Sequence, residues 1–118
     1  MTGVVNNDVS EAELLKKGFR HGVNLDKAVT EDANVRKFFA NRVDFILGAE
    51  QDILYLCQKL KYDYSIIQKL SIVVYEGEYY IAFGKDSSDE IVEKFKNAFE
   101  ELQKDGTLNK IINKYTTQ

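Results

Sequence analysis

At 118 residues the chain has the size of a single domain, and a chain of this length buries roughly two-thirds of its unfolded surface on folding. Its hydrophobic content of 44 % and charged content of 30 % are typical of a globular protein, and its net charge is −3. The 16 basic residues are interleaved with acidic ones, which argues against nucleic-acid binding because phosphate binding requires clustered Lys and Arg.

The first half of the chain alternates short apolar runs with helical patterns. Strands are predicted over 3–6, 21–25 and 43–47. A helix is predicted from the Asp8 cap to about Lys17, followed by helices over 31–41 and 50–61. The first helix is expected to bury Val9, Ala12 and Leu15, and the third to bury Ile53, Leu56, Cys57 and Leu60.

The second half of the chain begins with β-prone runs over 66–75 and 79–83, and these predict a hairpin around Glu76-Gly77. A capping box over 87–90 then opens a helix that ends at Gly106, and Thr107 caps a second helix. Both helices carry an apolar face that is expected to be buried, with Ile91, Phe95, Ala98, Phe99 and Leu102 on the first and Leu108, Ile111, Ile112 and Tyr115 on the second.

This order of elements predicts an α/β fold, in which helices cover both faces of a mainly parallel sheet in a three-layer α/β/α arrangement. No change of composition marks an internal boundary, so residues 1–118 are predicted to form a single domain. The simplest strand order is 2-1-3, and ligands of such sheets bind beyond the carboxyl ends of the strands where the order reverses.

Two loops meet at that point of the predicted sheet, over residues 6–10 and 48–51. Each loop opens a helix, so each offers backbone N–H groups and the positive end of a helix dipole, which favour a carboxylate or another small anion. The alternative interpretation is that these residues only cap and begin their helices. The candidate ligand-binding residues are Asn7, Asp8, Val9, Ser10, Ala49 and Glu50.

Signals for catalysis are missing from the sequence. One cysteine, Cys57, and one histidine, His21, cannot supply a structural zinc site, and no phosphate-binding, dinucleotide-binding or serine-nucleophile motif is present. Cys57 lies within an apolar helical pattern, which favours a buried, unreactive thiol over a nucleophile. We therefore expect no enzyme activity, no metal and no cofactor. No run of 18 apolar residues is present, and the N-terminus lacks the layout of a signal peptide.

Four stretches of the chain together resemble a known family. Phe39–Leu47 is similar to a segment of the form L-x-x-G-R-V-D-a-v, and Tyr79–Lys85 is similar to a strand of the form y-y-i-a-f-s-K. Residues 100–115 resemble a closing l-x-x-d-G-t-x-x-x-I-x-x-k-y pattern, and Val4–Phe19 ends in the L-x-x-x-G-F pattern. These motifs and their order resemble the C-terminal half of the extracellular solute-binding proteins, family 3, of polar-amino-acid transporters.

The resemblance implies one lobe of a type II periplasmic-binding-protein fold, in which two lobes close on a ligand like a hinge. Residues 1–76 would correspond to the second lobe, and residues 77–118 to the returning strand and C-terminal helices of the first. The arginine that grips the ligand carboxylate in the family lies in a part with no counterpart here. The family's Asp beyond its V-D-a-v strand, which binds the ligand's amino group, aligns with Ala49, and Glu50 is its neighbour.

The function expected from the resemblance is capture of an amino acid or similar small polar solute, in the periplasm or outside the cell. The partner would be the membrane permease of an ABC transporter. Alternatives are an extracytoplasmic sensing domain of a receptor, a small enzyme of flavodoxin-like architecture, and a fragment that binds nothing without the other half of the cleft. The apolar face over 91–102 would pack on the first sheet or be exchanged between two chains in a homodimer.

Overall fold

The computed structural model describes residues 1–116 and divides them into two compact units, residues 1–76 and residues 77–116. The division falls between Glu76 and Gly77. The prediction that both form one domain stays a prediction.

The first unit contains a three-stranded parallel sheet made of β1 (Thr2–Val5), β2 (Leu25–Ala28) and β3 (Phe45–Ile46). The strand order is β2-β1-β3, as predicted, with Thr2 opposite Leu25 on one side and opposite Phe45 on the other. The fold class of this unit is therefore α/β, and the predicted parallel sheet is confirmed.

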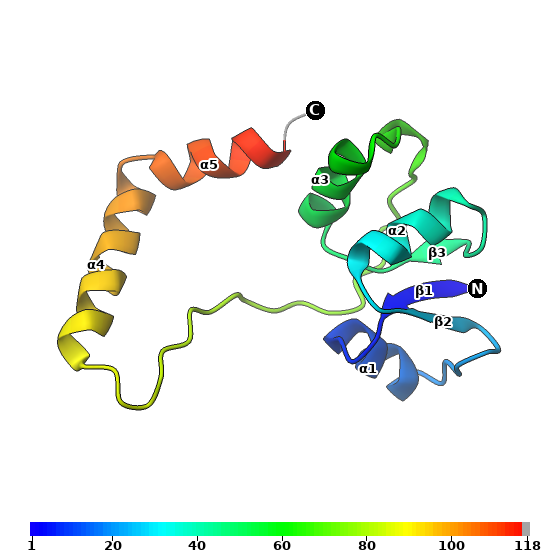
Figure 1. The fold of residues 1–118 in the computed structure, drawn as a ribbon, viewed down its shortest axis with the longest axis horizontal. Coiled ribbons are helices and arrows are strands. Elements are labelled where there is room, and N and C mark those ends of the chain that lie inside the picture. Colours follow the sequence, from blue (N-terminus) through cyan, green and yellow to red (C-terminus); the bar gives the residue numbers. More distant parts are fainter. Residues whose placement is uncertain (117–118) are drawn as a thin grey trace. The chain divides into compact units, whose positions relative to one another are not determined.

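Helices cover the sheet on both faces (Figure 1). The helix α1 (Val9–Lys16) follows β1 and lies on one face, while α2 (Glu31–Phe39) and α3 (Glu50–Leu60) lie on the other. A short 3₁₀ helix, η1 (Tyr64–Ile66), follows α3. Each of the three α-helices directly follows a strand of the sheet, which is the arrangement that the alternating sequence pattern predicts.

The unit is stabilised by two apolar clusters, one on each side of the sheet. One cluster joins α2 and α3 through Val35, Ile53, Leu56 and Cys57, and Phe39 stacks on Tyr62 at its edge with ring centroids 4.1 Å apart. The other joins Val4 and Leu25 of the sheet to Leu14 of α1, with Val74 packed against it. Cys57 is fully buried, which confirms the sequence interpretation, and burial raises the pKa of its thiol.

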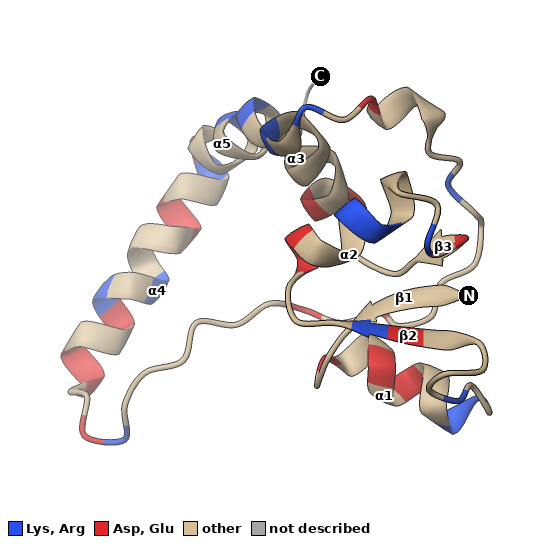
Figure 2. Ribbon diagram, turned by 45° about the vertical axis from the view of Figure 1, so that its right-hand side comes forward, with Lys and Arg blue, Asp and Glu red and all other residues tan. Residues whose placement is uncertain are grey.

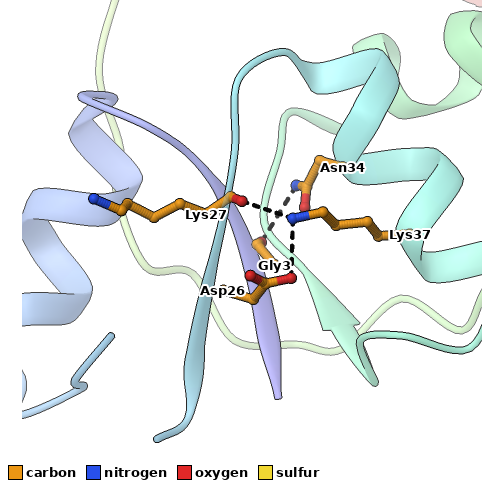
Figure 3. Close-up of polar contacts among 5 residues, drawn as sticks. All are labelled: Gly3, Asp26, Lys27, Asn34 and Lys37. Carbon is orange, nitrogen blue, oxygen red and sulfur yellow. Dashed lines mark hydrogen bonds and ion pairs between the residues drawn. The ribbon is translucent and has the colours of Figure 1, made fainter. Parts of the chain in front are cut away.

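A close approach between α2 and the central strand β1 holds α2 against the face of the sheet opposite α1. Gly3 faces the fully buried Asn34, whose side-chain amide donates a hydrogen bond to the Gly3 carbonyl oxygen at 3.3 Å (Figure 3). A Cβ atom at Gly3 would lie 2.2 Å from Asn34 Oδ1, so only glycine fits there. Lys37 adds a second tie one turn further along α2, because its ammonium group contacts Asp26 Oδ2 at 3.0 Å and the Lys27 carbonyl at 2.6 Å.

Two sequence predictions for the first unit are wrong in detail. The second strand lies at Leu25–Ala28 and not over 21–25, because residues 22–24 form a turn that includes Gly22 at φ +73°. The helix α1 buries Glu11 and Leu14, whereas Val9, Ala12 and Leu15, which were expected to be buried, are exposed. The apolar periodicity predicted the wrong buried face of α1 because a charged residue, Glu11, lies on that face.

The predicted hairpin over 66–83 is also wrong, and so is the returning strand at 79–83. The structure has no strand between residues 67 and 88, and Tyr79 is 91 % exposed. A strand needs a neighbouring strand to accept and donate its backbone hydrogen bonds, and within residues 1–116 no segment pairs with this run. High β-propensity without a partner leaves the backbone extended but unpaired.

The second unit consists of the strand-free segment over residues 77–88 and two helices, α4 (Asp89–Lys104) and α5 (Thr107–Thr116). Ser88 caps α4 by accepting a hydrogen bond from the Ile91 amide at 3.3 Å, so the cap lies one residue after Ser87, where the capping box over 87–90 places it. No described residue of this unit is buried, so the expected burial of both apolar faces is not observed. The exposed members are Ile91, Phe95, Phe99, Leu102, Ile111, Ile112 and Tyr115.

Candidate functional site

The first turns of α1, α2 and α3 lie at the same edge of the sheet. Because β1, β2 and β3 are parallel, their carboxyl ends share one edge, and each chain segment leaving that edge begins a helix. Figure 2 shows acidic residues in the first turns of α2 and α3. We call this region the carboxyl edge; it includes the loops 6–10 and 48–51 and the start of α2.

Glu31 is the first residue of α2, and the charges of Asp8 and Asp52 at the starts of α1 and α3 act on it. Its Oε1 atom is 3.0 Å from the position of a Cβ atom at Gly48, so the carboxyl group reaches the loop between β3 and α3. That oxygen is buried and has no hydrogen-bond partner within the described residues. Glu31 is not among the predicted site residues, which lie only in the loops after the first and third strands, although the loop after the second strand ends at the same edge.

The electrostatic environment of Glu31 is acidic. Burial raises its pKa above the ordinary value of 4.5, and a hydrogen bond with the Asn34 side chain opposes that shift. The charges of Asp8, Asp52 and Asp32 raise the pKa further. Negative charges from the starts of three helices therefore meet around this carboxyl group.

The cations near this edge neutralise other carboxylates. Lys59 contacts Asp32 at 3.2 Å, and Lys69 contacts Glu50 at 2.5 Å. In the described part of the chain, no ion pair involves Asp8, Glu31 or Asp52. The helix starts alone predict a small anion at this edge, whereas the unneutralised carboxylates favour a positively charged group beside Glu31.

The two predicted loops differ from ordinary helix starts in one respect. Neither the Asp8 side chain nor that of Ala49, the two N-cap residues, accepts a hydrogen bond from the first turn of its helix. By contrast, Thr30 at the start of α2 accepts one from the Ala33 amide at 3.1 Å. The starts of α1 and α3 thus keep first-turn N–H groups that no N-cap side chain satisfies, as an anion-binding helix start requires.

Four predicted site residues, 7–10, span the turn before α1 and the first two positions of that helix. The Asp8 carboxylate accepts a hydrogen bond from the Ser10 hydroxyl at 2.8 Å, so the predicted Asp8 cap is replaced by a side-chain pair. Asn7 has a left-handed backbone with φ +61°, and Val9 is exposed. Glu50 lies at the first position of α3 and is held by Lys69.

No family model, curated protein or solved structure matches the chain. Within residues 1–116, no group of three or more His, Cys, Asp and Glu side chains is arranged to hold a metal ion. None of the helices in that range is long and apolar enough to cross a membrane.

Proposed function

We propose that residues 1–76 form a ligand-binding lobe of a small-solute-binding protein of bacterial transport, in which closure of two lobes captures the solute. The observation that carries the proposal is the convergence of three helix starts at the carboxyl edge around Glu31, whose buried Oε1 atom has no hydrogen-bond partner among residues 1–116. The resemblance to solute-binding proteins of family 3 supports the same function.

The solute class follows from the two kinds of groups at this edge. The first-turn amides of α1 and α3 suit a carboxylate, because Asp8 and Ala49 do not cap them. The Glu31 carboxyl group suits an ammonium group, because it is acidic, partly buried and without a neighbouring cation. An amino acid carries both groups a few bonds apart, so we propose a zwitterionic amino acid or a close analogue.

Glu31 also accounts for the departure from the family pattern. In the family an Asp after the third strand binds the amino group, and Ala49 occupies that position here. The Glu31 carboxyl group reaches the same loop from α2, next to Gly48. We infer that it replaces the missing Asp. Binding then requires no chemical step, and the energy gained drives closure.

Thermal unfolding of the chain with a panel of the common amino acids at millimolar concentration tests the proposal. A ligand at a hundredfold excess over its Kd raises the free energy of unfolding by about 2.7 kcal/mol. We expect at least one amino acid to raise the Tm, and the same amino acid without its ammonium group to lose the effect.

Glu31→Gln and Asp8→Asn should each reduce that stabilisation by weakening the attraction for the ammonium group. Glu13→Gln is the matched control, because Glu13 lies in α1 and pairs with Lys16 at 2.9 Å, away from the carboxyl edge. The proposal fails if no amino acid shifts the Tm, or if Glu31→Gln binds as tightly as the unchanged chain.

A further inference from the structure

We propose that Glu11 and His21 are positioning residues that set the conformation of the loop over residues 7–10, and through it the direction of the α1 amides. This inference rests on the proposed function, because the loop is part of the proposed ligand site. It concerns residues that do not themselves lie among the proposed ligand contacts.

The Glu11 carboxylate makes one contact with each of its oxygens. The Oε2 atom accepts a hydrogen bond from the Asn7 backbone N–H at 2.6 Å, and the Oε1 atom lies 2.9 Å from His21 Nε2. Glu11 itself is only 6 % exposed. A carboxylate that is buried to this extent is costly unless both oxygens are satisfied, so its two contacts fix its position.

The contact with Asn7 acts on the backbone residue that redirects the chain into α1. Asn7 has φ +61°, a conformation that a residue with a side chain rarely adopts, although Asn tolerates it better than most. The amide held by Glu11 belongs to this residue, directly before the N-cap Asp8. The bond therefore stabilises the turn that orients the first-turn amides of α1.

The contact with His21 ties this turn to the sheet. His21 lies outside α1, in the segment that leads into β2, and it forms a backbone bridge with Leu25 at the start of that strand. Glu11 therefore connects the loop after β1 to the entry of the neighbouring strand. A simple capping role would need only the Asn7 contact, whereas the additional His21 contact restricts where the carboxylate can lie.

Amide hydrogen exchange of the full chain, without any ligand, tests the positioning role directly. In Glu11→Ala the Asn7 amide should exchange at least about tenfold faster, because a hydrogen bond to a charged acceptor is lost. In Glu11→Gln the carbonyl oxygen of the new side chain still accepts that bond, so slow exchange should be largely restored. The Val4 amide in β1 reports global unfolding, and Glu13→Ala is the matched control on the same helix.

The proposal is overturned if the Asn7 and Val4 amides accelerate equally in Glu11→Ala, since Glu11 would then stabilise only the fold. It is also overturned if the Asn7 amide of the unchanged chain exchanges as fast as in an unfolded peptide. His21→Ala should give a smaller acceleration at Asn7 than Glu11→Ala, again without an effect at Val4. Equal protection of Asn7 in His21→Ala and in the unchanged chain would remove His21 from the proposal.

Titration with L-glutamine as a probe then separates this inference from the proposed function. If the unchanged chain binds L-glutamine, His21→Ala should raise the Kd at least about threefold while the Tm without ligand changes little. An unchanged Kd would contradict the positioning role and leave the proposed function intact. If no amino acid of the panel stabilises the unchanged chain, the proposed function fails, and the exchange of Asn7 alone decides whether Glu11 and His21 fix the loop.

Discussion

The two units of this chain differ in what stabilises them. Residues 1–76 bury two apolar clusters around a parallel sheet, with Val4, Val35 and Cys57 fully excluded from solvent. Residues 77–116 form two well-defined helices, yet they bury no side chain. Strong local helix signals are therefore enough to define α4 and α5, whereas a tertiary core needs the sheet of the first unit.

The largest expected effect comes from truncating a buried side chain of the first unit. Leu25→Ala removes a side chain that is 1 % exposed and should lower the free energy of unfolding by about 3 kcal/mol. Phe99→Ala in α4 removes a larger side chain that is 43 % exposed and should change it by no more than about 0.5 kcal/mol. Urea unfolding measures both, and equal losses would show that the second unit has a core of its own.

The second-largest loss of stability is expected where α2 packs closely against β1 in the first unit. Gly3→Ala places a Cβ atom against Asn34 Oδ1 and should lower the free energy of unfolding by about 2 kcal/mol, because α2 must shift away from β1. The control is Gly84→Ala in the second unit, where the nearest atom to the new Cβ is 3.7 Å away. Its unfolding in urea should match that of the unchanged chain, and a large loss there would contradict the comparison.

Glu31→Gln should make the first unit more stable at neutral pH, by about 1 kcal/mol, because it removes a partly buried charge whose Oε1 atom has no hydrogen-bond partner among the described residues. The pKa of Glu31 is raised in the folded state, so the folded state holds this proton more tightly than the unfolded chain does. The destabilisation due to Glu31 therefore grows as the pH rises from below 4.5 through the higher folded pKa.

Urea unfolding between pH 4 and pH 7 checks this direction, since roughly that range spans the ordinary and raised carboxyl pKa values. Stability of the unchanged chain relative to Glu31→Gln should fall as the pH increases. Glu13→Gln, whose carboxylate pairs with Lys16, should not show this dependence. If the difference in stability between the unchanged chain and Glu31→Gln stayed constant over the whole range, the pKa of Glu31 would have to be the same in the folded and unfolded states.

The smallest effect is expected on the surface of the second unit. Lys94 contacts Glu90 at 3.0 Å, one helical turn away, and both side chains are more than 70 % exposed. Lys94→Ala should therefore lower the helical signal in circular dichroism only slightly, since such pairs contribute about 0.3 kcal/mol. A large loss of helicity would indicate that Lys94 has a role beyond this pair.

The sequence was sufficient to predict the order β2-β1-β3 and the starts of the five α-helices within residues 1–116 to within two residues, because hydrophobic periodicity and capping residues are local signals. The prediction of a strand at 79–83 was wrong because a strand depends on a partner strand, which local propensity does not reveal. Two of the helix starts at the carboxyl edge were predicted from topology. Glu31 was missed because its burial and its unsatisfied oxygen exist only once α2 packs against β1.

The lone thiol of Cys57 offers a direct probe of how the first unit opens. It is fully buried in the apolar cluster that joins α2 and α3, and burial raises its pKa, so a thiol-modifying reagent has neither access nor the reactive thiolate while this cluster stays packed. The labelling rate would then report how often the packing between these two helices opens. No engineered reporter is needed, since the chain has no second cysteine to complicate the signal.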